Sequence, residues 1–246
     1  MTSTSRLHDR RTVLKRAGAT AAAVSIAGCL GLGDDGPEGT VLSPPENYDR
    51  TKDIDLPYPK YGEELPETTI PAPLHDREVS TTEFVGERHA MLTVIYTSCT
   101  TVCPGLTTAL RRVQDDSVAE GYADEFAFMP TTFDPEQDTP GAIEEYCDAM
   151  GVDREVGNWY FLRPETPEEA KSVVQETFGV AFEGGAPADG HGGEHGDGGD
   201  GDQMRHFQHA SLILLVNKDG IVERAYNGGP PEAGAEIDDA RTLIEE

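Results

Sequence analysis

Two cysteines separated by three residues are the part of this sequence best suited to chemistry. Cys99 and Cys103 stand in the run Tyr-Thr-Ser-Cys-Thr-Thr-Val-Cys-Pro, directly after a short apolar stretch. In the first turn of a helix, residues four apart lie on one face, so both sulfurs can converge there. A helix N-terminus also stabilises negative charge and lowers the pKa of a thiol. Such a pair can form a disulfide, or it can hold a soft cation such as Cu(I).

A copper site of this kind needs a third ligand, and His209 is the best candidate. It comes just before the apolar run 211–216, so a strand of a sheet can hold it rigidly. His206 lies three residues earlier and is its nearest rival. A histidine at the start of a strand, taken without the cysteines, is more often a polar cap. His191 and His195 fall in a stretch of Gly and Asp, for which a solvated loop without function is the preferred interpretation.

Two acidic residues and a third cysteine are interpreted as structural. Asp134 and Asp138 could act as paired acids or as ligands of a hard metal, but Asp turns and a helix cap explain them better. Cys147 falls in the middle of an expected helix and is interpreted as an ordinary half-buried thiol.

The elements that must position the two cysteines alternate between strands and helices. The first of these elements is the β-branched and apolar run 91–96, which predicts a buried strand. Thr139 and Pro140 predict an N-cap and a first helical residue, and residues 217–220 (Asn-Lys-Asp-Gly) predict a hairpin turn. The expected strands are 91–96, 125–132, 159–162, 211–216 and 221–226, and the expected helices are 104–116, 140–150, 167–178 and 235–244. This order predicts an α/β three-layer sandwich with a central mixed sheet flanked by helices.

The amino end carries the features of an export signal. Residues 1–28 contain the pair Arg10 and Arg11 followed by a short apolar stretch, which resembles a twin-arginine signal. Residues 26–29 (Ile-Ala-Gly-Cys) resemble a lipobox, in which Cys29 becomes lipid-modified after cleavage. We therefore expect export by the twin-arginine route and a lipid anchor on the outer face of the cell membrane.

The composition of the rest of the chain predicts where its folded and flexible parts lie and argues against one class of partner. Residues 29–65 predict a flexible acidic tether, residues 66–246 the folded domain, and residues 184–202 a disordered loop of Gly, Asp and His within it. The net charge of −27 over 246 residues argues against nucleic acid as a partner, because phosphate binding needs clustered Lys and Arg. Acidity of this degree favours a halophilic origin, since it keeps proteins soluble in strong salt.

Taken together, these motifs resemble the Sco/SenC family. The resemblance covers about residues 69–246 and depends on the CxxxCP run, the segment 133–140 (Phe-Asp-Pro-Glu-Gln-Asp-Thr-Pro), the histidine before a strand, and the Asn-Lys-Asp-Gly turn. It implies a thioredoxin-like fold and a role in building the binuclear copper (CuA) centre of cytochrome c oxidase. With the signal and the acidity, the chain is similar to a lipoprotein of haloarchaeal type.

The resemblance also implies how copper is held. It implies one copper per chain, bound by Cys99, Cys103 and His209, and a Cys99–Cys103 disulfide in the oxidised, metal-free form. Family members often have Asp before the histidine, whereas this chain has Gln208, so a possible carboxylate behind the imidazole is absent.

Two functions stay open at this point. The first is a membrane-anchored copper metallochaperone that hands copper to a subunit of a terminal oxidase. The second is an enzyme, a thiol–disulfide oxidoreductase that reduces the cysteines of that subunit, with Cys99 attacking and Cys103 resolving the mixed disulfide. A peroxidase on the same fold and a purely structural module are weaker alternatives.

Overall fold

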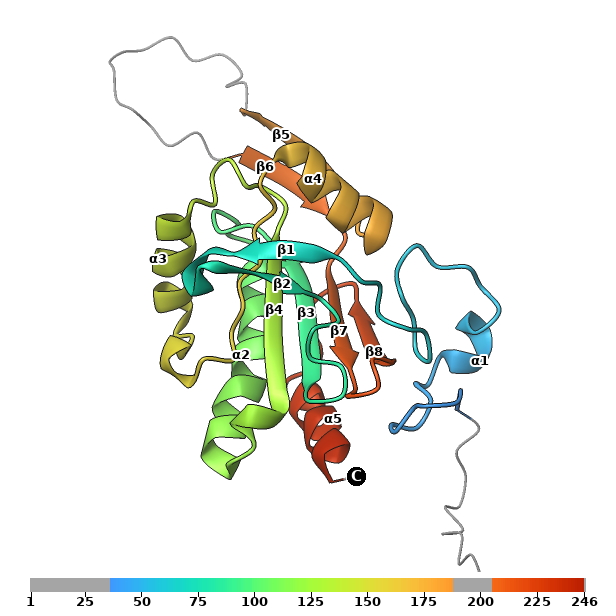
Figure 1. Cartoon of the computed structure of the whole chain (residues 1–246). Helices are drawn as coiled ribbons and strands as arrows, with labels where there is room; N and C mark the ends of the chain where they lie inside the picture. The colour runs from blue at the N-terminus through green and yellow to red at the C-terminus, as the bar shows by residue number, and fades with distance from the viewer. Residues whose placement is uncertain (1–35, 188–204, 246) are drawn as a thin grey trace, which may run out of the picture. The chain divides into compact units, whose positions relative to one another are not determined.

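The computed structural model describes residues 36–187 and 205–245 and, for residues 184–187 and 205–209, the backbone alone. These residues belong to one compact unit (Figure 1). The expected signal, Cys29, His191 and His195 lie outside the described residues, as does most of the loop expected over 184–202. None of the helices in the described part is both long and apolar enough to cross a membrane.

A mixed four-stranded sheet forms the centre of the molecule. From one edge to the other, its strands are β4 (Phe126–Thr132), β3 (His89–Ile95), β7 (Leu212–Val216) and β8 (Val222–Asn227). β3 runs parallel to β4 and antiparallel to β7, which in turn runs antiparallel to β8. Every residue of β3, β4 and β7 is buried, as expected for strands covered on both faces.

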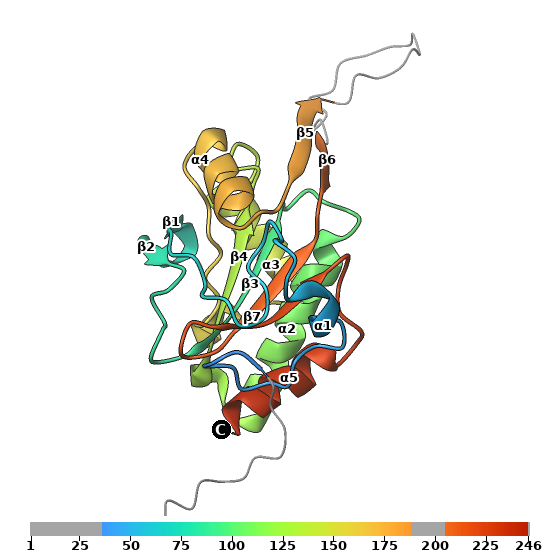
Figure 2. The same cartoon turned by 90° about the vertical axis from the view of Figure 1, so that its right-hand side faces the viewer.

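Helices cover the sheet on both sides and complete the three layers. The helices that follow the strands are α2 (Cys103–Glu120), α3 (Pro140–Met150), α4 (Pro167–Lys171) and α5 (Ala235–Ile244). Figure 2 shows α2 and α5 on one side of the sheet, and α4 with the hairpin of β1 (Thr69–Ala72) and β2 (Arg77–Ser80) on the other. A further two-stranded ribbon consists of β5 (Phe182–Pro187) and β6 (Arg205–His209). The predicted fold class, an α/β sandwich with a mixed sheet, is confirmed.

Local signals predict most elements of the central sheet and its helices, and Pro130 explains why the strand expected over 159–162 is incomplete. α3 begins at Pro140, and Thr139 Oγ1 accepts a hydrogen bond from the backbone N of Ala142 at 3.2 Å, as its N-cap role predicts. The strand expected over 159–162 makes only two isolated bridges to β4. Pro130 in β4 has no N–H to donate, so the backbone ladder on that side is interrupted.

The segment predicted to be a flexible tether differs from the prediction over residues 36–65, which we call the strap. The strap contains the short helix α1 (Tyr48–Thr51) and pairs with β8, where the backbone N of Gly62 donates to the carbonyl of Val222 at 2.8 Å. The buried side chains of the strap include Leu42, Tyr61 and Leu65. The tether prediction is therefore wrong for these residues, because they cover the open edge of β8.

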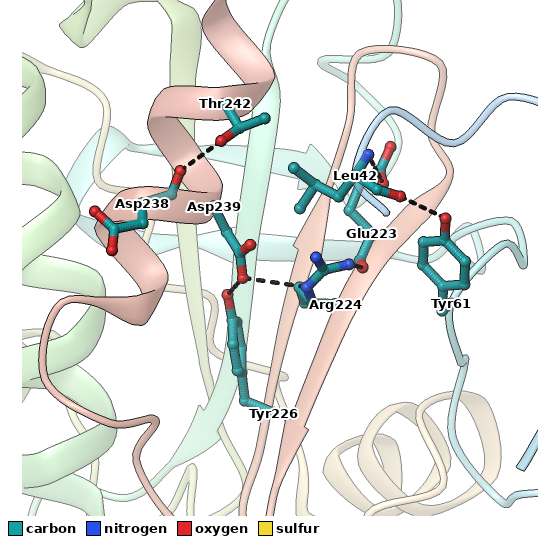
Figure 3. A network of polar contacts seen from close by, with 8 residues as sticks. All are labelled: Leu42, Tyr61, Glu223, Arg224, Tyr226, Asp238, Asp239 and Thr242. Atoms are coloured by element: carbon teal, nitrogen blue, oxygen red, sulfur yellow. Dashed lines mark hydrogen bonds and ion pairs between the residues drawn. The ribbon is translucent and has the colours of Figure 1, made fainter. Parts of the chain in front are cut away.

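A buried carboxylate fastens the strap to the sheet (Figure 3). Glu223 of β8 is fully buried and accepts hydrogen bonds from the backbone N of Val41 at 2.8 Å and of Leu42 at 3.0 Å. The side-chain amide of Asn217 donates to the same carboxylate at 2.5 Å. The Tyr61 hydroxyl also donates to the carbonyl of Leu42 at 2.5 Å. These bonds tie the strap to the end of the sheet at which β8 begins.

Candidate thiol site

The two cysteines lie at the point where β3 ends and α2 begins. Residues 96–102, which we call the thiol loop, connect these elements, and Cys103 is the first residue of α2. Cys99 lies outside the helix, in a turn closed by its backbone N donating to the carbonyl of Tyr96 at 3.2 Å. The spacing of the cysteines predicts that both lie in one helical turn, whereas α2 begins only at Cys103, with Pro104 in its first turn. The loop, not the helix, therefore brings Cys99 to Cys103.

Both cysteines are in the thiol form and buried, and a hydrogen bond joins the two side chains. Cys99 Sγ also lies 3.5 Å from Thr101 Oγ1. Burial opposes ionisation of Cys99, but hydrogen bonds from the Cys103 thiol, from the Thr101 side chain and from the backbone amides of Thr101 and Cys103 lower its pKa from 9.0 to about 7. These donors stabilise the Cys99 thiolate.

The second thiol of the pair is shifted in the opposite direction. Burial raises the pKa of Cys103, and the hydrogen bond to Cys99 raises it further. The pair therefore ionises first at Cys99, while Cys103 keeps its proton and donates it to the Cys99 sulfur. In a pair whose thiols differ in pKa in this way, one sulfur is the nucleophile and the other is the resolving thiol.

A buried carboxylate lies directly beneath the thiol loop. Asp138 has no exposed surface, and its two carboxylate oxygens each lie 3.2 Å from the backbone N of Thr97. The Thr97 hydroxyl donates to it at 2.5 Å, and the Thr132 hydroxyl at the end of β4 donates to the other oxygen. Burial raises the pKa of Asp138 from 3.8 to about 6, although the hydrogen bonds from Thr132 and Thr97 oppose the rise.

The sequence interpretation of Asp138 missed this position. The sequence predicts a loop with Asp turns followed by a cap at Thr139, and Thr139 does cap α3, but no part of that prediction buries Asp138 beneath the thiol loop. Asp134 is also buried, and its carbonyl accepts from the backbone N of Asp138 at 3.0 Å, so the predicted Asp turn is present. No local pattern distinguishes a buried Asp from an exposed one here, because its partner Thr97 lies 41 residues away in the chain.

The backbone of His209 reaches the same end of the sheet. It pairs with Phe182 across the β5–β6 ribbon, and the Phe182 ring stacks on Phe133, with centroids 4.8 Å apart. Phe133 in turn contacts the ring of Tyr96 at 5.1 Å, at the start of the thiol loop. His206 lies in the same strand. The side chains of both histidines lie outside the described residues, so the predicted choice of His209 over His206 stays a prediction.

The loop that follows β8 forms a wall beside the first turn of α2. A Cβ atom at Gly105 would come within 2.5 Å of Pro230 Cγ, so the close approach of this loop requires glycine there. Pro230 itself is exposed. The start of the helix that carries Cys103 is therefore lined by a proline that faces solvent.

The third described cysteine has no part in this arrangement. Cys147 is buried in α3, and burial raises the pKa of its thiol to about 12. Among the residues with described side chains, no three His, Cys, Asp or Glu residues form a cluster suited to a metal ion. The residues with described side chains include Cys99 and Cys103 but not His209.

Comparison with known proteins gives one family and one fold. The model of the SCO1/SenC family matches residues 74–244. None of the curated proteins matches the chain significantly. Among solved structures, a SCO1/SenC family lipoprotein from Bacillus anthracis is 19% identical, with a TM-score of 0.55, over 77% of this chain and 99% of its own.

Two further structures share this fold. ScoI of Arabidopsis thaliana, solved with copper bound, is 17% identical, with a TM-score of 0.55, over 74% of this chain and 99% of its own. BsSco, described as a member of the Sco family of cytochrome c oxidase assembly proteins with a disulfide switch, is 22% identical, with a TM-score of 0.51, over 76% of this chain and 96% of its own. At these identities the likeness shows the fold.

Proposed function

Because the chain belongs to the SCO1/SenC family, we propose that it binds copper and assists assembly of a cytochrome oxidase. The matched region contains the whole thiol loop and the strand that ends at His209. The copper-bound ScoI of Arabidopsis and the oxidase assembly role given for BsSco support the same assignment. The finer proposal is delivery of copper to the CuA centre of the oxidase.

The hydrogen-bonded pair Cys99–Cys103 is the observation that carries this proposal. Two thiolates are soft donors suited to Cu(I), and an imidazole, which we assign to His209, suits either copper oxidation state. Cys99 ionises near neutral pH, whereas the proton of Cys103 leaves when a metal binds. The donor set therefore fits copper better than a hard cation such as Mg²⁺.

We also propose that the domain is attached to the outer face of the cell membrane. The twin-arginine motif and the lipobox at Cys29 support export and lipidation. Mass spectrometry of the membrane fraction tests the anchor, and an unmodified Cys29 would contradict it.

Copper binding by variants of the chain tests the proposed ligands. The chain from residue 30 onward retains the strap and can be reduced and loaded with Cu(I) without oxygen. We expect one copper per wild-type chain, and strong loss of retained copper in Cys99→Ser, Cys103→Ser and His209→Ala. Cys147→Ser is the matched control, since it removes a buried thiol away from the loop. Full retention in all three site variants would contradict the proposal.

The unequal acidity of the thiols favours a second candidate, a thiol–disulfide oxidoreductase. The Cys99 thiolate would attack a disulfide of the oxidase copper subunit, and Cys103 would then displace the second sulfur and close the Cys99–Cys103 disulfide. Two electrons pass to the substrate, which leaves as two thiols. Such activity requires both cysteines and survives His209→Ala, whereas copper binding through the imidazole does not. Assaying both reactions with the same variants separates the two functions.

A further inference from the structure

The carboxylate of Asp138 makes its hydrogen bonds away from its own helix. Thr139 Oγ1 caps α3, so the carboxylate of Asp138 is not needed there. Its donors come instead from the thiol loop and from the end of β4, through Thr97 and Thr132. Burying a carboxylate is costly unless such donors compensate it. The position is therefore explained by what it holds and not by the helix it precedes.

The residue that Asp138 holds most firmly lies two positions before Cys99. Both the backbone N and the hydroxyl of Thr97 donate to the carboxylate. Thr97 lies within the turn that Cys99 closes by donating its backbone N to Tyr96 at 3.2 Å. Fixing Thr97 therefore fixes the direction in which this turn presents the Cys99 sulfur.

Asp138 is itself anchored on the other side of the site. Arg163 Nε donates to the carbonyl of Asp138 at 2.8 Å, and Arg163 Nη2 donates to the carbonyl of Pro135 at 2.7 Å. The Thr132 hydroxyl ties the carboxylate to the last residue of β4, which pairs with Ile95, the last residue of β3. The carboxylate thus connects the thiol loop to two rigid strands.

We propose that Asp138 is a positioning residue, whose carboxylate holds the thiol loop so that Cys99 lies against Cys103. The proposal rests on the proposed use of these two thiols, and it applies to copper binding and to disulfide chemistry alike. In both, two sulfurs must be held at one place, and their effective concentration falls when the loop that carries one of them is free to move. In this assignment Asp138 acts through its hydrogen bonds to Thr97.

Equilibration of the reduced chain with glutathione disulfide measures that effective concentration without copper. Cys99 and Cys103 lose two protons and two electrons and join, while one glutathione disulfide becomes two glutathione thiols. We expect Thr97→Val, which keeps the carboxylate but removes one bond to it, to lower the equilibrium constant about tenfold. Asp138→Ala should lower it further, and Asp138→Asn, which keeps one acceptor oxygen, should restore part of the loss.

Glu223→Gln is the matched control, because Glu223 is also a fully buried carboxylate that holds backbone amides, at the opposite end of the sheet. It should leave the equilibrium constant within about twofold of wild type. An unchanged constant in Thr97→Val, or an equal fall in Glu223→Gln, would overturn the proposal. A fall in Asp138→Asn without one in Thr97→Val would overturn it too, since Asp138 would then act by its charge. If Asp138→Ala does not fold, the other two variants decide.

Cu(I) affinity measured on the same variants separates this inference from the proposed function. A wild-type chain that binds no copper contradicts the proposed function, while the glutathione equilibrium still tests Asp138. A wild-type chain that binds copper, with affinity reduced in Thr97→Val and unchanged in Glu223→Gln, supports both. Equal affinity in wild type, Thr97→Val and Asp138→Asn would contradict the positioning role at the metal site.

Discussion

Asp138 and Glu223 hold irregular segments at opposite ends of one sheet. Asp138 holds the thiol loop where β3 and β4 end, and Glu223 holds the strap where β8 begins. Both are fully buried, and burial raises the pKa of each. They differ in what the held segment carries, because the thiol loop contains Cys99, whereas the strap covers a sheet edge with apolar side chains.

The comparison of Asp138 with Glu223 shows that a buried, hydrogen-bonded carboxylate can serve either the stability of the fold or the chemistry of a site. A buried carboxylate with several donors fixes backbone that has no regular ladder of its own. At the strap, the carboxylate helps to cover a sheet edge and to enlarge the core, so loss of Glu223 should lower the free energy of unfolding. At the thiol loop, the carboxylate positions a sulfur, so loss of Asp138 should change the thiol–disulfide equilibrium constant as well as the free energy of unfolding.

The largest effect on stability is expected at the strap. Glu223→Ala leaves the backbone N–H groups of Val41 and Leu42 and the amide of Asn217 without their acceptor, and should lower the free energy of unfolding by about 3 kcal/mol. Urea denaturation measures this loss, and limited proteolysis should cut within residues 36–65. The exposed Glu232, changed to Ala, is the control and should leave the midpoint unchanged.

The same variant sharpens the contrast between the two ends. The glutathione equilibrium of Glu223→Ala should match that of wild type at temperatures where the variant is folded. A shift as large as that of Thr97→Val would show that the strap and the thiol loop are coupled, and the separation of their roles would be wrong.

A smaller effect is expected in the pH dependence of stability. A carboxyl whose pKa is higher in the folded than in the unfolded state binds its proton more tightly when folded. For Asp138, the stability from this source is fully present below pH 3.8 and is lost as the pH rises through about 6. Asp138→Asn lacks this contribution, so the stability of wild type relative to the variant should fall over that range by on the order of 2 kcal/mol.

Unfolding of both chains by urea at several pH values measures this difference and cancels the background from the many other carboxylates. Glu223→Gln is the parallel comparison, because the pKa of Glu223 is raised as well and its contribution has the same sign. A relative stability that rises with pH, or that does not change, would contradict the assigned protonation of Asp138.

Sequence reasoning succeeded where the signal is local. The apolar run of β3, the hairpin turn at residues 217–220 and the cap at Thr139 each depend on neighbours in the chain, and each element appears close to its expected bounds. The two cysteines were also brought together as predicted, although Cys99 lies in a turn and not in the helix.

Sequence reasoning failed where the partners are distant. The strap has buried residues too far apart to show a period, and the edge of β8 that they cover lies about 160 residues later. In the sequence, the neighbours of Asp138 are those of an ordinary polar loop residue, and only its contact with Thr97 of the thiol loop distinguishes it. In both cases the deciding partner is a backbone amide in another segment, and amides leave no trace in side-chain patterns.

The smallest effect separates the carboxylate of Asp138 from the helix cap beside it. Thr139→Ala removes the hydrogen bond to the backbone N of Ala142 and should lower the free energy of unfolding by about 1 kcal/mol. It leaves every donor to Asp138 in place, so the glutathione equilibrium should stay that of wild type. Thr139→Ser, which keeps a capping hydroxyl, should restore the stability. If Thr139→Ala instead shifted the equilibrium as far as Thr97→Val, the start of α3 would be positioning Cys99, and Asp138 would only transmit it.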